Sequence, residues 1–366
     1  MIYKDLIFVH KEKEACHLVE KLWGKHPLFT CVIGNTDTGK IKGISAAGAH
    51  PDITDFTPSA DVELVALGRC QCIKGIPVTP EGIPTPAIIT QTALACAQIP
   101  FLVVNAGVRV NPQIPFIDVG GKPGKDIREN NAVYDPEHTL KRAILLGKEL
   151  GNLCDFLVVG ESIAGGTTTA LGVLQGLGYH AFGKVSSSLP HNPHKLKKLI
   201  VKTALKKLPQ NPTVFDVMQE MGDPMIPVHA GVCIGAAQKV PVFMAGGTQM
   251  VGVLAVIKEV EKSVLNRIAI ATTQWIVTDT SSRIVELVHE VASVPVIATR
   301  LSFAHARYTG LQVYEQGVVK EGVGAGGATI AAYLKTKGML SNRRLLQEIE
   351  TIYEDLCHPQ KEKSVS

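Results

Sequence analysis

The sequence predicts a doubly wound α/β fold, in which a mostly parallel sheet carries helices on both faces. Short apolar runs rich in β-branched residues recur along the chain, and helical candidates separate them. These runs are apolar at successive positions, a pattern typical of strands that are buried on both faces. Alternation of such strands with helices favours a parallel sheet over an all-β or all-α architecture.

The predicted strands are apolar runs that end near glycine or polar residues: 29–33, 62–67, 101–108, 156–160, 240–247, 267–272 and 294–299. The predicted helices lie between these runs, over residues 86–98, 136–150, 167–177, 195–208, 248–261, 281–291 and 326–337. In doubly wound sheets, ligands bind beyond the carboxyl ends of the strands. The residues that follow each run are therefore the candidates for a site.

The chain has 366 residues, more than one typical hydrophobic core supports. We expect a large α/β nucleotide-binding catalytic domain over residues 28–338. Residues 1–27 have the pattern of a leading helix closed by Gly24 and Pro27, and residues 339–366 that of a charged helix and tail. The two ends are predicted to pack together as a smaller helical domain.

The composition indicates a compact α/β enzyme, with 45% hydrophobic residues, 19% charged residues and 34 glycines. A net charge of +4 is too small to imply a nucleic-acid partner. The eight cysteines form no C-x-x-C pair, so neither a metal site nor a disulfide framework is expected. Because no apolar stretch approaches the roughly 18 residues of a membrane span, and no signal peptide is evident, we expect a cytoplasmic protein without membrane contact.

The stretch GNTDTGKI at residues 34–41 has the glycine and lysine spacing of a phosphate-binding P-loop. Its Lys40 is followed by Ile41, which cannot bind Mg²⁺, and Gly43, Gly48 and Pro51 oppose the helix that the motif requires. The sequence therefore predicts a turn after a strand, which can still lie in a site, and not a nucleoside triphosphate site.

The stretch VVGESIAGGTTTALGVL at residues 158–174 predicts a phosphate site. A strand runs into a Gly-rich turn and a helix whose free N–H groups and threonine hydroxyls suit an anion. Glu161 lies at the edge of this turn. The alternative is that the threonines only cap the helix. The candidate phosphate-binding residues are Gly165, Gly166, Thr167, Thr168 and Thr169.

The stretch VVKEGVGAGGATIAAYL at residues 318–334 repeats this arrangement with an acidic residue, Glu321, before the turn. Its following neighbours, Gly322 and Gly324 among them, are small, so they would desolvate the carboxylate and raise its pKa. A general base that works near neutral pH needs such a pKa. The alternative is a solvent-facing glutamate that the helix dipole stabilises.

Three further stretches are weaker candidates for ligand contacts. The long loop at residues 104–133 begins near Asn105 and has several cations that suit a phosphate or carboxylate. The turn at residues 246–254 has Gly246, Gly247 and Gln249, whose amide could bind a ring. The basic helix at 195–208 is amphipathic and faces either water or ligand; its apolar positions are Leu196, Leu199, Ile200, Ala204 and Leu208.

The Gly-rich motifs resemble those of a known family. GESIAGGTTTALGVL is similar to the pattern GEMGIGNTT-A-A of the nicotinate-nucleotide:dimethylbenzimidazole phosphoribosyltransferases, and KEGVGAGGATIA to their R-L-G-E-G-T-G-A. Between the two, GKVSSSLPHNPHKLKKLIVKTAL resembles the family's GRGTG…K…V…AL segment, and GGTQMVGVLA resembles its GG-E-IA-LAGA turn. The stretch from residue 34 to residue 63 resembles a divergent branch of this family.

The resemblance implies a phosphoribosyltransferase without a cofactor or metal. The ribose 5-phosphate of nicotinate mononucleotide would pass to an aromatic base, giving α-ribazole phosphate and nicotinate for the lower ligand of a cobamide. By motif position, the catalytic glutamate falls on Glu321, a second active-site glutamate on Glu161, and a lysine on Lys197 or Lys198. The resemblance also implies a homodimer.

Two departures from the family pattern leave the acceptor open. Glycine stands where the Gly-Thr turn has asparagine, and Gln249 stands in place of a glutamate. The base could be dimethylbenzimidazole, another benzimidazole, adenine or a phenolic compound. Two other functions fit the same turns: a different phosphoribosyl or nucleotide-processing enzyme, and a non-catalytic nucleotide sensor. The phosphoribosyltransferase interpretation requires Glu321 to lie near the turn at residues 167–169.

Overall fold

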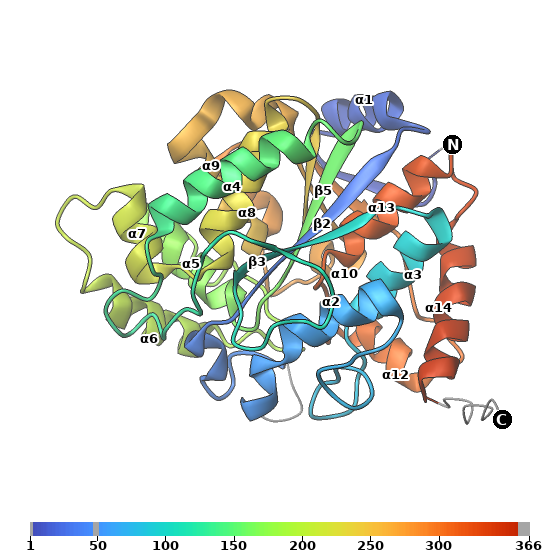
Figure 1. The fold of residues 1–366 in the computed structure, drawn as a ribbon, viewed down its shortest axis with the longest axis horizontal. Helices are drawn as coiled ribbons and strands as arrows, with labels where there is room; N and C mark the ends of the chain where they lie inside the picture. The colour runs from blue at the N-terminus through green and yellow to red at the C-terminus, as the bar shows by residue number, and fades with distance from the viewer. Residues whose placement is uncertain (1–2, 47–50, 358–366) are drawn as a thin grey trace.

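The computed structural model describes residues 3–46 and 51–357. Its centre is one sheet of eight strands in the order β1-β8-β7-β6-β5-β2-β3-β4, which crosses the middle of the molecule (Figure 1). Only the β1–β8 pair is antiparallel. The strands are β1 (Leu6–His10), β2 (Pro27–Gly34), β3 (Phe101–Gly107), β4 (Ile117–Asp118), β5 (Phe156–Ser162), β6 (Val242–Ala245), β7 (Ile268–Thr273) and β8 (Val296–Thr299).

Helices cover both faces of the sheet (Figure 1), which confirms the predicted doubly wound α/β fold. The helices that build the two layers and the loops around them are α1 (Glu12–Leu22), α2 (Thr57–Leu67), α3 (Ala87–Ala97), α4 (Pro136–Leu150), α5 (Gly166–Gly176), α6 (His194–Leu205), α7 (Val214–Met221), α8 (Met225–Ala237), α9 (Gln249–Glu261), α10 (Gln274–Val277), α11 (Ile284–Val291), α12 (Thr309–Gln312), α13 (Ala325–Lys335) and α14 (Asn342–Cys357).

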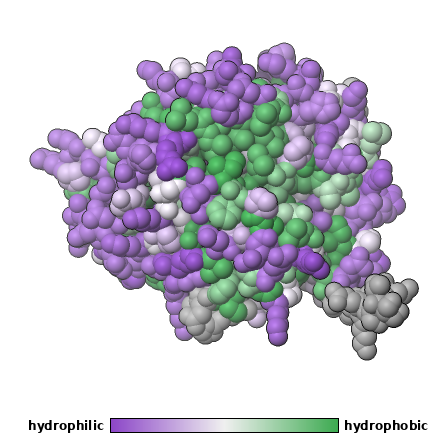
Figure 2. All heavy atoms as spheres, in the orientation of Figure 1, coloured by the Kyte–Doolittle hydropathy of each residue, from purple (hydrophilic) through white to green (hydrophobic). Residues whose placement is uncertain are grey.

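Successive residues of the strands enter two separate hydrophobic cores. In β5, Val159 packs in the core that α4, α5, α8 and α9 cover, whereas Val158 packs in the core that α3 and α13 cover. Each strand therefore needs apolar side chains at both odd and even positions, which explains the uninterrupted apolar runs. Hydrophilic side chains dominate the outline of the molecule, and apolar ones lie through the middle of the face in Figure 2.

The predicted strand at 62–67 is wrong, because these residues belong to α2. The helix begins with Pro58 in its first turn and ends at Gly68, which has the left-handed φ of 69° that favours glycine. Residues 57–65 are all buried, so the helix shows no apolar stripe. A run that is apolar on every side has no period by which a helix differs from a buried strand.

The N-terminal segment also differs from the prediction of a single leading helix. Residues 6–10 form β1, which pairs with β8 at the edge of the main sheet, and only α1 is helical in this segment. At the other end of the chain, α14 packs against α3. The division into a large and a small domain remains a prediction.

The strand order indicates where a ligand site is expected. From β2 the chain proceeds to β3 and β4 on one side, and from β5 it proceeds to β6, β7 and β8 on the other. The direction therefore reverses between the neighbouring strands β2 and β5. The carboxyl ends at such a reversal diverge into a crevice, where doubly wound proteins bind ligands.

Candidate active site

A cavity of about 940 Å³, counting the space open to solvent, lies at the carboxyl ends of β5, β6 and β7, where Glu161, Gly247 and Ile276 line it. Two stretches that are far apart in the sequence, residues 158–174 with Glu161 and residues 318–334 with Glu321, both contribute to its wall; we call them the Glu-Gly motifs. The predicted site residues in its lining are Glu161, Gly165, Gly166, Thr167, Gly247, Gln249, Glu321 and Gly322.

The turn between β5 and α5 is built for close approach. Gly165 has a φ of 83°, and a Cβ at this position would lie 2.6 Å from the Cα of Gly39. A Cβ on Gly166 would lie 2.5 Å from Oε1 of Gln249. Gly39 belongs to the P-loop-like stretch, which forms a short 3₁₀ helix over Asp37–Lys40. This stretch supports the turn between β5 and α5 from behind.

The three threonines of this turn have different environments. Thr167 lines the cavity, whereas Thr168 and Thr169 are buried within the protein. The hydroxyl of Thr169 donates hydrogen bonds to the carboxylate of Asp223 and to the carbonyl of Gly166. Of the three hydroxyl groups, that of Thr167 is therefore the one available to a ligand in the cavity.

Lys197 reaches the same turn from α6. Its Nζ donates to Oγ1 of Thr167 at 2.7 Å and to the carbonyl of Ser186 at 2.6 Å. The side chain is fully buried, and within the described part of the chain no carboxylate lies at ion-pair distance. Burial, with a smaller contribution from Lys320, lowers the pKa of Lys197 to about 7. Lys198 is exposed and lies near the ring of Phe182.

Glu161 lies near the end of β5 and is 8% exposed. Burial raises the pKa of its carboxyl to about 8, and repulsion from Asp223, Glu321 and Asp61 adds to the effect. The Gln249 amide opposes this rise. Nevertheless, Nε2 of Gln249 has no hydrogen-bond partner of good geometry among the described residues, although the side chain is only 5% exposed. A buried amide donor in the wall of a cavity is a group that a ligand can satisfy.

Glu321 lies where the chain enters α13. Its Oε1 accepts hydrogen bonds from the N–H groups of Gly322 and Gly326, each at 3.2 Å, and its Oε2 accepts one from Thr272 at 3.4 Å. Burial raises the pKa of this carboxyl to about 7, although these hydrogen bonds oppose the rise. Glu321 therefore titrates near neutral pH inside the same cavity as Thr167.

Asp61 is a cavity residue that the sequence analysis did not single out; it directly precedes residues 62–67, which were predicted to be a strand. It lies in α2, and its two oxygens accept hydrogen bonds from Thr85 and Ser162, each at 2.7 Å. Burial raises the pKa of Asp61 to about 6. Pro58 and Gly68, which begin and end α2, were the available signals of a helix.

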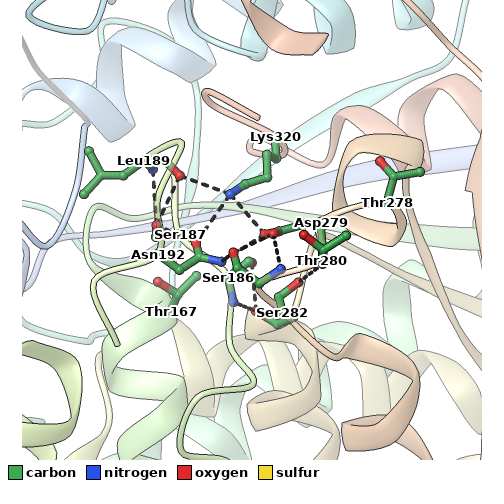
Figure 3. Close-up of polar contacts among 12 residues, drawn as sticks. Thr167, Ser186, Ser187, Leu189, Asn192, Thr278, Asp279, Thr280, Ser282 and Lys320 are labelled. Atoms are coloured by element: carbon green, nitrogen blue, oxygen red, sulfur yellow. Dashed lines mark hydrogen bonds and ion pairs between the residues drawn. The ribbon is translucent and has the colours of Figure 1, made fainter. Parts of the chain in front are cut away.

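A serine segment, residues 186–188, forms another part of the wall that the sequence did not single out. Figure 3 shows how the chain beyond it is held: Nζ of Lys320 donates to the carbonyl of Leu189 and pairs with Asp279, each at 3.0 Å. Asn192 joins the two parts by donating to Asp279 at 3.0 Å and accepting from Ser187 at 2.8 Å. These contacts hold the serine segment beside the residue that precedes Glu321.

Seven predicted residues lie outside the cavity lining: Thr168, Thr169, Lys197 and Lys198, described above, and Asn105, Gly246 and Gly324. The side chain of Asn105 accepts from the N–H groups of Gly107 and Val108, so it shapes the turn after β3. Gly246 donates its N–H to the carbonyl of Ala271. Gly324 begins α13 with a φ of 66° and packs on Phe29. In this arrangement Asn105, Gly246 and Gly324 support the strand ends behind the site.

The described residues contain no group of three or more histidine, cysteine, aspartate or glutamate side chains that could hold a metal ion. Nor does any helix in residues 3–46 and 51–357 have the length and apolar character needed to cross a bilayer.

Comparisons with known proteins agree with the motifs. A family model described as "Phosphoribosyltransferase" (DBI_PRT) matches residues 87–274. The UPF0284 protein of Sulfurisphaera tokodaii is 47% identical over 89% of this chain and 93% of its own. That of Sulfolobus acidocaldarius is 48% identical over 90% of this chain and 94% of its own.

Solved structures show the same fold at low sequence identity. CobT from Thermus thermophilus has a TM-score of 0.57 and 15% identity, over 88% of this chain and 89% of that chain. A structure of nicotinate-nucleotide-dimethylbenzimidazole phosphoribosyltransferase from the same organism has a TM-score of 0.55 and 14% identity, over 93% and 92%.

The fold and the matched family model define the class as a phosphoribosyltransferase, and therefore a transferase. The chain belongs to this CobT-like family, within the branch of the UPF0284 proteins. The resemblance drawn from the Glu-Gly motifs is thus confirmed.

Proposed function

We propose that the protein transfers the ribose 5-phosphate of nicotinate mononucleotide to an aromatic base, giving an α-ribazole-type phosphate for the lower ligand of a cobamide. The observation that carries this proposal is one cavity whose wall contains both Thr167, which a buried lysine without a carboxylate partner contacts at 2.7 Å, and the carboxyl group of Glu321, whose pKa is about 7. The first suits the phosphate, and the second suits removal of a proton from the base.

The 5′-phosphate would bind at the start of α5. Free N–H groups of the helix, the Thr167 hydroxyl and the Lys197 amine converge on this point. A buried amine with a pKa near 7 is poorly stabilised as a cation, so a phosphate that restores the missing negative charge gains a charge-assisted contact. Gly165 and Gly166 let the turn pack against Gly39 and Gln249, which fixes the position of these N–H groups.

The reaction would be a displacement at the anomeric carbon. A nitrogen of the base forms a bond to C1′ while the bond from C1′ to the pyridinium nitrogen breaks, and its electron pair leaves with nicotinate as a neutral ring. The N–H proton on the attacking azole passes to Glu321. Because the leaving group is already cationic, it departs without a metal or a proton donor. Glu161, neutral at pH 7 by its pKa of about 8, would donate a hydrogen bond to the ribose.

The proposal is tested by incubating the purified protein with nicotinate mononucleotide and a panel of bases, and measuring nicotinate release by chromatography. Release that depends on the base supports it. A different phosphoribosyl or nucleotide-processing enzyme would release no nicotinate with any base. A non-catalytic sensor would bind the nucleotide in calorimetry and show no turnover. Homodimerisation and a cytoplasmic location also remain predictions, and light scattering tests the first.

A further inference from the structure

Asp61 is a buried carboxylate for which the proposed reaction has no use. Its side chain is 4% exposed, and each oxygen accepts one hydroxyl hydrogen bond, from Thr85 or Ser162. An ionised carboxylate offers about four acceptor positions, so two are left. Among the residues that the structure describes, no cation lies within ion-pair distance of it. A buried negative charge with neutral partners alone is costly, which makes a ligand donor favourable.

Asp61 lies in the part of the cavity near Glu321, where the base would bind; we call this part the base end. It is tied through Thr85 to residues 77–86, and this segment passes beside the general base: a Cβ on Gly322 would lie 3.3 Å from Cγ of Pro86. Thr90 also donates to the carbonyl of Val323 at 2.9 Å. The phosphate end, with Thr167 and the serine segment, is connected to Asp61 through its other partner, Ser162, which ends β5.

The wall around Asp61 is otherwise suited to a flat ring. Val78, Ile83 and Pro86 line the cavity there, together with several threonines. An apolar wall of this kind accepts the faces of a bicyclic base, whose azole nitrogen must lie near Glu321 for the proton transfer. The six-membered ring of that base would then extend past residues 77–86 toward α2.

We propose that Asp61 selects the acceptor, and that the preferred base carries an N–H or O–H donor on its six-membered ring. This inference rests on the proposed function. A ring edge with only methyl groups would displace water from Asp61 without replacing its hydrogen bonds, and the carboxylate would be left unpaired. An amino or hydroxyl group on the same edge donates to it. Sites built around such a hydrogen bond discriminate strongly against analogues that lack it.

Two probes of nearly equal size isolate this contact: 5-aminobenzimidazole and 5-methylbenzimidazole. For the unmodified enzyme with nicotinate mononucleotide, we expect kcat/KM for the amino compound to exceed that for the methyl compound by at least about 100-fold. Asp61→Asn should reduce this ratio by about 10-fold or more through loss of the amino compound's advantage. Asp61→Leu should bring the ratio close to one. The KM for nicotinate mononucleotide should stay unchanged in Asp61→Asn, because the contact is with the base.

Equal use of the two probes by the unmodified enzyme would overturn the inference. So would an equal loss with both probes in Asp61→Asn, which would mean that Asp61 only supports the fold. If no base releases nicotinate, the proposed function fails by itself, and calorimetric binding of the two probes decides the role of Asp61. Tighter binding of the amino compound that Asp61→Asn abolishes supports it, and equal binding refutes it.

Discussion

Nζ of Lys197 lies 2.7 Å from Oγ1 of Thr167, so a buried amine on α6 contacts the first turn of α5 where Thr167 lines the cavity. In the described chain, the charged form of this amine lacks a carboxylate partner. A phosphate bound beside Thr167 would supply the missing charge.

Lys197→Met should weaken binding of nicotinate mononucleotide by about 10- to 100-fold, the range expected for one lost hydrogen bond to a charged group. Lys198→Met is the matched control, because Lys198 is adjacent and exposed. Isothermal titration calorimetry compares the two variants. An equal loss of affinity in both, or none in Lys197→Met, would remove Lys197 from the phosphate site.

Glu321→Gln should lower kcat by about 10²- to 10⁴-fold, the usual contribution of a general base. The amide keeps the shape of the side chain, so the dissociation constant for nicotinate mononucleotide should change little. Single-turnover nicotinate release and calorimetry measure the two quantities. Unchanged turnover would exclude Glu321 as the base, whereas loss of both binding and turnover would indicate a structural role.

The pH dependence of kcat/KM should be bell-shaped with its maximum near pH 7. The pKa of Glu321 is raised to about 7 by burial, so the basic form increases as pH rises through 7. The pKa of Lys197 is lowered to about 7 by burial, so its charged form is lost over the same interval. Because bound phosphate favours the charged lysine, the falling limb should move to higher pH in kcat.

Rates measured from pH 5 to pH 9 with Lys197→Met check this assignment. In the variant the falling limb of kcat/KM should move from about pH 7 to about pH 8, where Glu161 loses its proton, and the rising limb should stay. A falling limb that remains near pH 7 in Lys197→Met would belong to another group.

Glu161→Gln should stabilise the free protein at alkaline pH. The pKa of Glu161 is raised by burial from 4.5 to about 8, so its folded state favours the neutral carboxyl. Burial of Glu161 costs no stability below about pH 4.5, because the carboxyl is then neutral in both the folded and the unfolded state. The cost grows as pH rises and is complete above about pH 8. A neutral glutamine has no such cost. The free energy of unfolding of the variant should therefore exceed that of the unmodified protein by roughly 2 to 4 kcal/mol at pH 9, given 1.36 kcal/mol for each pKa unit.

Urea denaturation at pH 5 and pH 9 measures this difference. At pH 5 the advantage of Glu161→Gln should nearly disappear. An advantage of the same size at both pH values would mean that packing, and not the charge, is responsible.

Breaking the ion pair between Lys320 and Asp279 from one side should destabilise the protein by about 3–5 kcal/mol, because the remaining charge is buried. Lys320→Met leaves Asp279 without its cation, and the double variant with Asp279→Asn removes both charges. Chemical denaturation should show the double variant to be more stable than Lys320→Met alone. Additive losses would contradict a direct coupling between the two residues.

The local sequence pattern was sufficient to predict the doubly wound fold, the family and the two Glu-Gly motifs. Glycine at a left-handed φ and free N–H groups at the start of a helix are local properties. The turn at residues 165–167 and the place of Glu321 before α13 could therefore be predicted from neighbouring residues alone. The tertiary structure then brings these two segments together, and the N–H of Val323 donates to the carbonyl of Glu161 at 3.0 Å. The sequence analysis could only predict that the two segments meet.

The tertiary structure alone decided which side chains face the cavity. In α6 the buried positions are Lys197, Ile200, Val201 and Ala204, whereas Leu199 of the predicted apolar stripe is 66% exposed. The choice between Lys197 and Lys198 depends on which face of α6 packs against α5. An analysis of hydrophobic periodicity assigns every lysine to the exposed face, so it could not identify Lys197 as buried. Asp61 was missed because α2 is buried all round, and a helix without a polar side has no period to distinguish it from a strand.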